Sequence, residues 1–291
     1  NQKFTVLVRT FWNILMTFKN QKVLDFYEKL PFNIYGDLKS AEDQIKRSDP
    51  LTIYPELGKI FEKFDKIKII DYGCGGGGLV NSISYHHRNK AQVTGVDFNP
   101  VVIKYANELK EKLNLNSKFY SSDLFTFQSN VKYDLIISLG VLHHTNNCHE
   151  AIKHICRSAG KNSYLFLGLY HKYGREPFLN HFRDMKDKSE DFKFNEYKKL
   201  HKNIKDEKKL YSWFRDQVLH PHETQHSFEE ISTVLIKGGY NILSCSLNRF
   251  NKIKNLEDVI SLEKEQYQYS LNKIKNCEYF PGFFITIAKK E

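Results

Sequence analysis

The most informative stretch of the sequence is IIDYGCGGGG, residues 69–78. A short apolar run ends at Asp71, and glycine then occupies five of the six positions 73–78. Glycine lacks Cβ, so its backbone adopts positive φ and lets a ligand come close to its amide groups. Residues 79–84 continue as a helix whose N-terminus is electropositive. The stretch therefore predicts a strand, a nucleotide-binding loop and a helix.

Strand and helix patterns alternate from residue 66 onward, with short spacers between most of them. This alternation is typical of a parallel sheet with helices on both faces. We expect strands at 67–71, 92–97, 117–122, 133–139, 163–169, 240–247 and 283–289. We expect helices near 78–88, 99–114, 147–159 and 228–238, and Asn99 and Pro100 suit the start of the second. The predicted fold class is α/β, with a doubly wound, mostly parallel sheet.

The N-terminal part has helical spacing over residues 4–30, with a break near 19–21 and a stop at Pro31. Residues 4–18 are apolar apart from polar positions such as Arg9, and they are shorter than the ~20 apolar residues that a membrane span needs. We expect an amphipathic helix that packs on the domain; a helix on a membrane surface is the alternative. Asp37 or Ser40 caps a further helix. We divide the chain into a helical cap, 1–59, and a domain, 60–291.

The composition restricts the possible partners and compartment. The chain has 291 residues and a net charge of +10, which suits an anionic partner but also fits a general lysine bias, because acids compensate every lysine tract. Its five cysteines are scattered and form no C-x-x-C pair. Neither a disulfide framework nor a thiolate zinc site is indicated, and a reducing cytoplasm fits best.

One spacer is much longer than the others. Residues 170–227 separate the fifth strand from the helix at 228, whereas such connections usually take a few residues. The centre of this spacer, 186–209, alternates lysine with acids among aromatic residues, which indicates solvated helices. Because it follows the carboxyl end of a central strand, it lies over the crevice where such sheets bind ligands. We predict a helical substrate lid; a decoration without contact to the site is the alternative.

Taken alone, the glycine loop is compatible with either of two ligand classes. Residues 73–78 satisfy G-x-G-x-x-G, and Asp97 follows at the distance of a ribose ligand, which is the dinucleotide pattern. Other features favour an amino-acid-bearing nucleoside. Asp71 lies where it would meet an amino group, Asp123 and Leu124 suit an adenine ring, and strand 133–139 leads to a polar exit at 143–144.

Together these residues resemble the class I S-adenosylmethionine-dependent methyltransferases. The acid followed by G-x-G-x-G at 71–77 matches the first motif of that family, and the acids at 97 and 123 match its ribose and adenine ligands. The resemblance implies a seven-stranded sheet with an antiparallel last strand, and S-adenosylmethionine as the cofactor. The cofactor-binding residues that it implies are Asp71, Gly73, Cys74, Gly75, Gly77, Asp97, Phe98, Asp123, Leu124 and Leu139. Simple structural roles are the alternatives: a glycine turn for the loop, a helix N-terminal charge for Asp97 and a turn acid for Asp123.

Methyl transfer needs a positioned acceptor and, where that acceptor carries a proton, a base. Histidine has a suitable pKa, so His143 and His144 are candidate bases, with Tyr170 beside them at the end of the fifth strand. In the resembled family such a histidine pair accompanies very different acceptors. The histidine pair is therefore also compatible with a structural role common to the fold, without a part in the chemistry.

The segment 220–226 contains three histidines and one glutamate. Three interpretations stay open: metal binding, substrate binding or base chemistry, and hydrogen bonds that fasten the lid. We assign no metal ligand, name His222 and Glu223 as catalytic candidates, and name His220 and His226 as substrate-binding candidates. Tyr173 and Arg175 could clamp a carboxylate or phosphate, unless Arg175 is an ordinary surface residue.

The sequence thus predicts a cytoplasmic methyltransferase whose acceptor is a small polar molecule enclosed by 170–227. One alternative is an RNA (tRNA) methyltransferase, which fits the net charge, although an N-P-P-Y loop is absent after the fourth strand. Another is a binding module without catalysis. The oligomeric state is not predicted.

Overall fold

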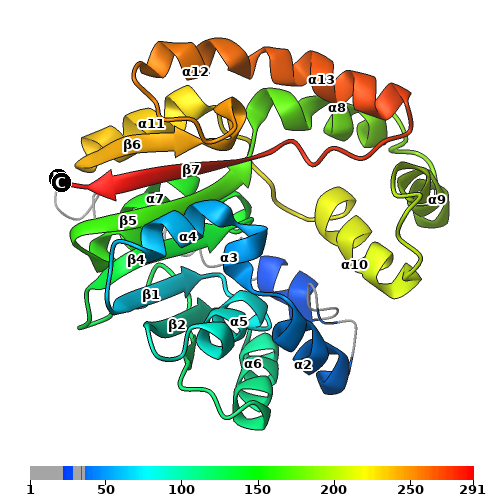
Figure 1. Cartoon of the computed structure of the whole chain (residues 1–291). Helices are drawn as coiled ribbons and strands as arrows, with labels where there is room; N and C mark the ends of the chain where they lie inside the picture. Colours follow the sequence, from blue (N-terminus) through cyan, green and yellow to red (C-terminus); the bar gives the residue numbers. More distant parts are fainter. Residues whose placement is uncertain (1–21, 29–33, 35–36) are drawn as a thin grey trace, which may run out of the picture.

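The computed structural model describes residues 22–28, 34 and 37–291, which fold around a seven-stranded sheet (Figure 1). The strands are β1 (Ile67–Tyr72), β2 (Ala91–Asp97), β3 (Lys118–Ser121), β4 (Tyr133–Leu139), β5 (Ala159–Tyr170), β6 (Tyr240–Cys245) and β7 (Phe283–Lys290). Their order in the sheet is β3-β2-β1-β4-β5-β7-β6. The neighbouring pairs among β1 to β5 are parallel, whereas β7 is antiparallel to both β5 and β6. The predicted fold class and the seven strands are confirmed.

The strand order reverses between β1 and β4. After β1 the chain continues to β2 on one side of the sheet, and after β4 it continues to β5 on the other side. In open α/β sheets, ligands bind beyond the carboxyl ends of the strands at such a point. The glycine loop follows β1, and residues 140–145 follow β4. The topology therefore places both segments at the crevice.

Within residues 37–291 the chain forms twelve α-helices: α2 (Leu38–Arg47), α3 (Pro50–Ile53), α4 (Pro55–Phe61), α5 (Gly78–His86), α6 (Pro100–Lys112), α7 (Cys148–Ile155), α8 (Lys172–Arg183), α9 (Glu190–Leu200), α10 (Glu207–Val218), α11 (Phe228–Lys237), α12 (Leu256–Glu263) and α13 (Glu265–Lys275). Residues 22–28 are helical as well. The amphipathic helix expected at 4–18 lies outside the described residues. Asp37 caps α2 and Asn99 caps α6, as predicted.

The core has two layers because neighbouring residues of a strand point to opposite faces. Ile69 packs with α4, α5 and α6 on one face, and Ile70 packs with α7, α11 and α12 on the other. Both side chains are fully buried. Burying an isoleucine contributes roughly 1.5–3 kcal/mol to stability. The apolar residues of β1 therefore pack against the helices on both faces of the sheet.

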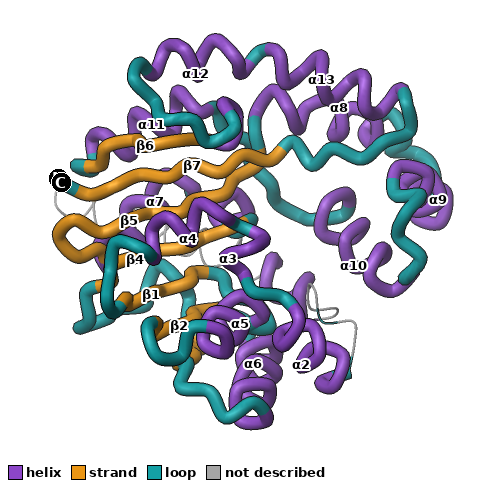
Figure 2. The backbone as a smooth tube through the Cα atoms, viewed as in Figure 1, coloured by secondary structure: helices purple, strands orange, loops and turns teal. Residues whose placement is uncertain are grey.

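The long spacer between β5 and α11 contains α8, α9 and α10, which share their own apolar cluster around Phe178, Tyr197 and Phe214. Figure 2 shows α9 and α10 past the ends of the strands, on the right of the view, and α8 beside α13. Helices α12 and α13 were not predicted from the sequence. In α13 only Ser270 is fully buried, so its apolar pattern is weak.

No helix in the described ranges combines the length and the apolar character that crossing a membrane requires. The five cysteines all lie in the described part and are free thiols.

Candidate functional site

The glycine loop occupies residues 73–77, between the end of β1 and the start of α5. Gly73 has φ +78°, and a Cβ there would lie 2.3 Å from the Val141 side chain. Gly75 has φ +51°, and a Cβ there would meet nothing within 4 Å. The first glycine thus lets β1 and the segment after β4 approach each other, and the second leaves open space beside the backbone.

Asp97 ends β2 and faces the loop. Its carboxylate accepts hydrogen bonds from the backbone N–H groups of Gly75 and Asn99, each at 2.9 Å. These two bonds fix the orientation of the carboxylate and join the ends of β1 and β2. Burial raises the pKa of Asp97, although the backbone donors act against this shift.

Asp71 is a buried acid, 5% exposed, near the end of β1, whereas Asp97 is half-buried. Burial, together with the nearby negative charge of Asp97, raises the pKa of Asp71 to about 7. A cationic group that entered the cavity would favour the ionised form of both acids.

A cavity of about 780 Å³ opens over these residues. This volume lies within the range of small-molecule sites. Nine of the expected cofactor-binding residues line it: Asp71, Gly73, Cys74, Gly75, Asp97, Phe98, Asp123, Leu124 and Leu139. Gly77 is not among the lining residues, because it caps α5 with φ +73° and faces Ala106 and Phe119. The structure therefore brings together most of the set that the sequence predicted.

A further group of lining residues, which we term the α10 side, comes from distant parts of the chain. It consists of Tyr27, His144, Tyr170, Trp213, Asp216, Gln217 and Tyr279. Of these seven residues, His144 and Tyr170 were predicted from the sequence, and the other five were not. Trp213 and Asp216 are three positions apart on α10, a spacing that places both on one helix face. That spacing was the available signal, whereas nothing near Tyr27 or Tyr279 pointed to a site.

Asp216 is the buried acid of the α10 side. The Tyr27 hydroxyl donates a hydrogen bond to its Oδ1 at 2.5 Å, and the Arg215 side chain donates to the Phe26 carbonyl at 3.2 Å. Burial raises the pKa of Asp216, and the electrostatic interaction with His144 acts against this rise. The helical segment 22–28 is thus tied to α10 beside the cavity.

His144 differs from its neighbour His143. His144 lines the cavity, and its Nδ1 donates to the His222 carbonyl at 3.0 Å. This bond leaves Nε2 of the neutral ring as an acceptor, and Nε2 has no hydrogen-bond partner among the described residues. His143 does not line the cavity, and burial lowers its pKa well below the usual value. The geometry therefore separates the two candidate bases and favours His144.

The segment 220–226 lies along residues 143–145 and does not line the cavity. His222 donates from Nε2 to the Thr145 carbonyl at 2.9 Å. His220 lies against the His144 ring, with 3.8 Å between ring centroids, and burial lowers its pKa to about 2. These contacts match the interpretation in which the segment is fastened by hydrogen bonds.

Arg175 and Glu223 form an ion pair with each other. Arg175 is fully buried, and its guanidinium donates to both oxygens of Glu223, at 3.0 and 2.9 Å, and to the Gln217 carbonyl. An internal carboxylate thus occupies the place expected for a bound carboxylate or phosphate. Tyr173 and His226 are also absent from the cavity lining. His226 instead lies near His149 and Glu230, a grouping that the sequence did not predict.

Comparisons with known proteins cover the same part of the chain. A family model described as "Methyltransferase domain" matches residues 63–218, more than half of the chain. The ubiquinone biosynthesis O-methyltransferase of Rickettsia felis is 27% identical over 137 residues, 46% of this chain and 54% of that protein. The (S)-tetrahydroprotoberberine N-methyltransferase of Eschscholzia californica is 30% identical over 100 residues, 34% of this chain and 28% of that protein. The chain thus matches less than two thirds of the length of these relatives.

Solved structures share the fold. PKMT2 from Rickettsia typhi superposes with a TM-score of 0.60 at 17% identity, covering 81% of this chain and 52% of that chain. Magnesium protoporphyrin IX methyltransferase from Synechocystis PCC 6803, solved with bound SAH, gives a TM-score of 0.51 at 18% identity and covers 96% of this chain and 99% of that chain. Because the matched family model spans β1 to β5 and the loop that carries the glycines, the chain belongs to the class I S-adenosylmethionine-dependent methyltransferases.

Proposed function

We propose that the chain transfers the methyl group of S-adenosylmethionine to a small polar molecule that binds at the α10 side of the cavity. The donor would occupy the side formed by the glycine loop and the acids Asp71, Asp97 and Asp123. Residues 170–227 would act as a lid through α10, with the helical segment 22–28 of the proposed cap, 1–59, closing beside it.

The observation that carries this proposal is the buried acid Asp216 on the α10 side. A carboxylate at the acceptor position would repel the phosphates of RNA, whose binding depends on Lys and Arg contacts. The same carboxylate and the aromatic rings of Tyr27 and Trp213 suit a small molecule with hydroxyl or amine groups. The matched O- and N-methyltransferases support an acceptor of this kind.

In this proposal His144 is the base. Where the acceptor oxygen or nitrogen carries a proton, that proton has to leave on methyl transfer. His144 lines the cavity, and its Nε2, which has no other hydrogen-bond partner among the described residues, would take the proton. His222 would act through His144, because its carbonyl fixes the ring tautomer. His143 would have no contact with substrate.

The acceptor class can be tested with methyl-labelled S-adenosylmethionine. The intact chain would be incubated with a panel of small hydroxylated and amine compounds and, separately, with total tRNA. We expect label in the small-molecule fraction. Ribonuclease-sensitive label in the tRNA fraction alone would contradict the proposal.

The base can be tested with His144→Ala. Loss of a general base lowers kcat by about 10²- to 10⁴-fold, while binding of the donor product should change little. His181→Ala on α8 is the control, because His181 does not line the cavity. If both variants turned over at the wild-type rate, His144 would be excluded as the base.

A further inference from the structure

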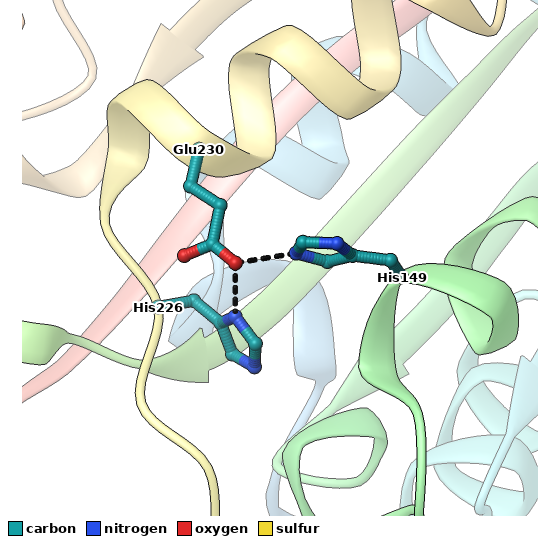
Figure 3. Close-up of side chains that lie close together, drawn as sticks. All are labelled: His149, His226 and Glu230. Atoms are coloured by element: carbon teal, nitrogen blue, oxygen red, sulfur yellow. Dashed lines mark hydrogen bonds and ion pairs between the residues drawn. The ribbon is translucent and has the colours of Figure 1, made fainter.

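Three side chains from different elements meet outside the cavity lining. His149 belongs to the first turn of α7, His226 precedes α11, and Glu230 lies in the first turn of α11 (Figure 3). Each offers one ligand atom, and these atoms all lie within 4.8 Å of one another. Figure 3 shows both imidazole rings directed at the same carboxylate oxygen.

The Glu230 carboxylate is held in this orientation by its own helix. Its Oε2 accepts a hydrogen bond from the Ser227 backbone N–H at 3.4 Å, as part of a capping box. Its Oε1 contacts Nε2 of His149 and lies 3.1 Å from Nδ1 of His226. One oxygen thus supports the helix start, and the other faces the two imidazoles.

The hydrogen bonds of His226 indicate that a cation belongs between these groups. The Thr224 hydroxyl donates to the His143 carbonyl at 3.0 Å, so its oxygen accepts from Nε2–H of His226 at 2.9 Å. In the neutral ring, Nδ1 then carries a lone pair that faces Glu230 Oε1. Two acceptors facing each other are stable only with a proton or a metal ion between them. A ring N–H that donates to a fixed outer partner is typical of histidines that bind metal.

We propose that His149 Nε2, His226 Nδ1 and Glu230 Oε1 bind a zinc-class divalent metal ion. Two imidazoles and one carboxylate are a ligand set of Zn²⁺, whereas Mg²⁺ and Ca²⁺ prefer oxygen ligands alone. With bonds of about 2.0–2.1 Å in tetrahedral geometry, the 3.1 Å between Nδ1 and Oε1 is close to the separation needed. The side chains of His149 and Glu230 are 38% and 36% exposed, so an ion can enter from solvent and keep a water as its fourth ligand.

The ion would join α7 and α11 to the segment 224–226. Thr224 bonds through its backbone N–H and its hydroxyl to the His143 carbonyl. The segment 220–226 also holds His144 in its tautomer. The site therefore has a structural role: it fastens the segment that supports the cavity wall at His144.

The test uses the intact chain after chelator treatment and titration with ZnCl₂ in a calorimeter. We expect one saturable site per chain and a rise of several degrees in Tm on zinc addition. Cobalt(II) in place of zinc should give the visible absorption bands of a tetrahedral site.

Variants separate this cluster from other zinc-binding groups. His149→Ala should weaken zinc binding by at least about 100-fold, and Thr224→Val, which removes an outer partner, by about 10- to 100-fold. His154→Ala is the matched control, because His154 is on the same helix but its ring nitrogens contact the Phe127 carbonyl and the Arg157 guanidinium, outside the cluster. It should bind zinc as the wild type does.

Two results would overturn the proposal. One is the absence of saturable zinc binding to the wild-type chain, which would mean that a proton alone lies between the imidazoles and the carboxylate. The other is equal zinc affinity in His149→Ala and His154→Ala. The binding readout is independent of methyl transfer, so it separates this proposal from the one on function.

Discussion

Asp71, which is buried, and Asp97, which is half-buried, line the cavity where we propose that the cationic methyl donor binds. Asp97 is held by two backbone N–H groups, whereas burial and the neighbouring acid raise the pKa of Asp71 to about 7. Without ligand, these two negative charges oppose each other. We infer that the donor, whose sulfonium and ammonium groups are positive, offsets this cost on binding.

A pH-dependent stability difference should follow from Asp71. Its folded pKa of about 7 exceeds the unfolded value of about 4, so the native state binds the extra proton between these pH values. The unfolding free energy of the unliganded wild type should fall as pH rises through this window, relative to Asp71→Asn, by a few kcal/mol. Urea unfolding at pH 4.5 and pH 8 measures this difference. Parallel profiles for the two proteins would rule out the raised pKa.

Asp97→Ala should weaken binding of the donor product by roughly 1–3 kcal/mol, because it removes a charged acceptor and leaves the Gly75 N–H without its partner. Calorimetric titration measures the loss. Asp43→Ala on α2 serves as the control, since Asp43 is exposed and outside the cavity lining. Equal affinities in both variants would remove Asp97 from the donor site.

Among the secondary-structure elements, α10 and the helical segment 22–28 form the contact that the sequence did not foresee. Their link consists of the Tyr27–Asp216 hydrogen bond and the Arg215 bond to the Phe26 carbonyl. Tyr27 and Asp216 are 189 positions apart in the sequence. No periodicity within either element specifies such a pairing, because it depends on how the whole insertion packs.

Tyr27→Phe should loosen this link. The variant leaves the buried Asp216 carboxylate without its phenolic donor, at a cost of about 1–3 kcal/mol. Hydrogen exchange of the backbone amides in 22–28 should become about tenfold faster or more. Tyr211→Phe removes a comparable bond, to the exposed Glu190, and should leave these amides unchanged. Unchanged exchange in Tyr27→Phe would show that the bond does not hold the segment.

For the whole molecule, the sheet and the donor side of the cavity were predictable, and the α10 side largely was not. The glycine loop and the acids at 71, 97 and 123 are local signals, each fixed by the end of one strand. Tyr27, Asp216 and Tyr279 meet only through tertiary packing. The histidines at 220–226 formed a recognisable cluster in the sequence. In the structure, His222 bonds to the backbone after β4, and His226 lies with His149 and Glu230.

The most direct test of the donor site is calorimetric titration of the intact chain with S-adenosylhomocysteine and, in parallel, with NAD. The glycine loop by itself fits either ligand, and the acids at 71 and 123 favour the adenosyl amino acid. We predict saturable one-to-one binding of S-adenosylhomocysteine and no binding of NAD. Binding of NAD with no binding of S-adenosylhomocysteine would contradict the account.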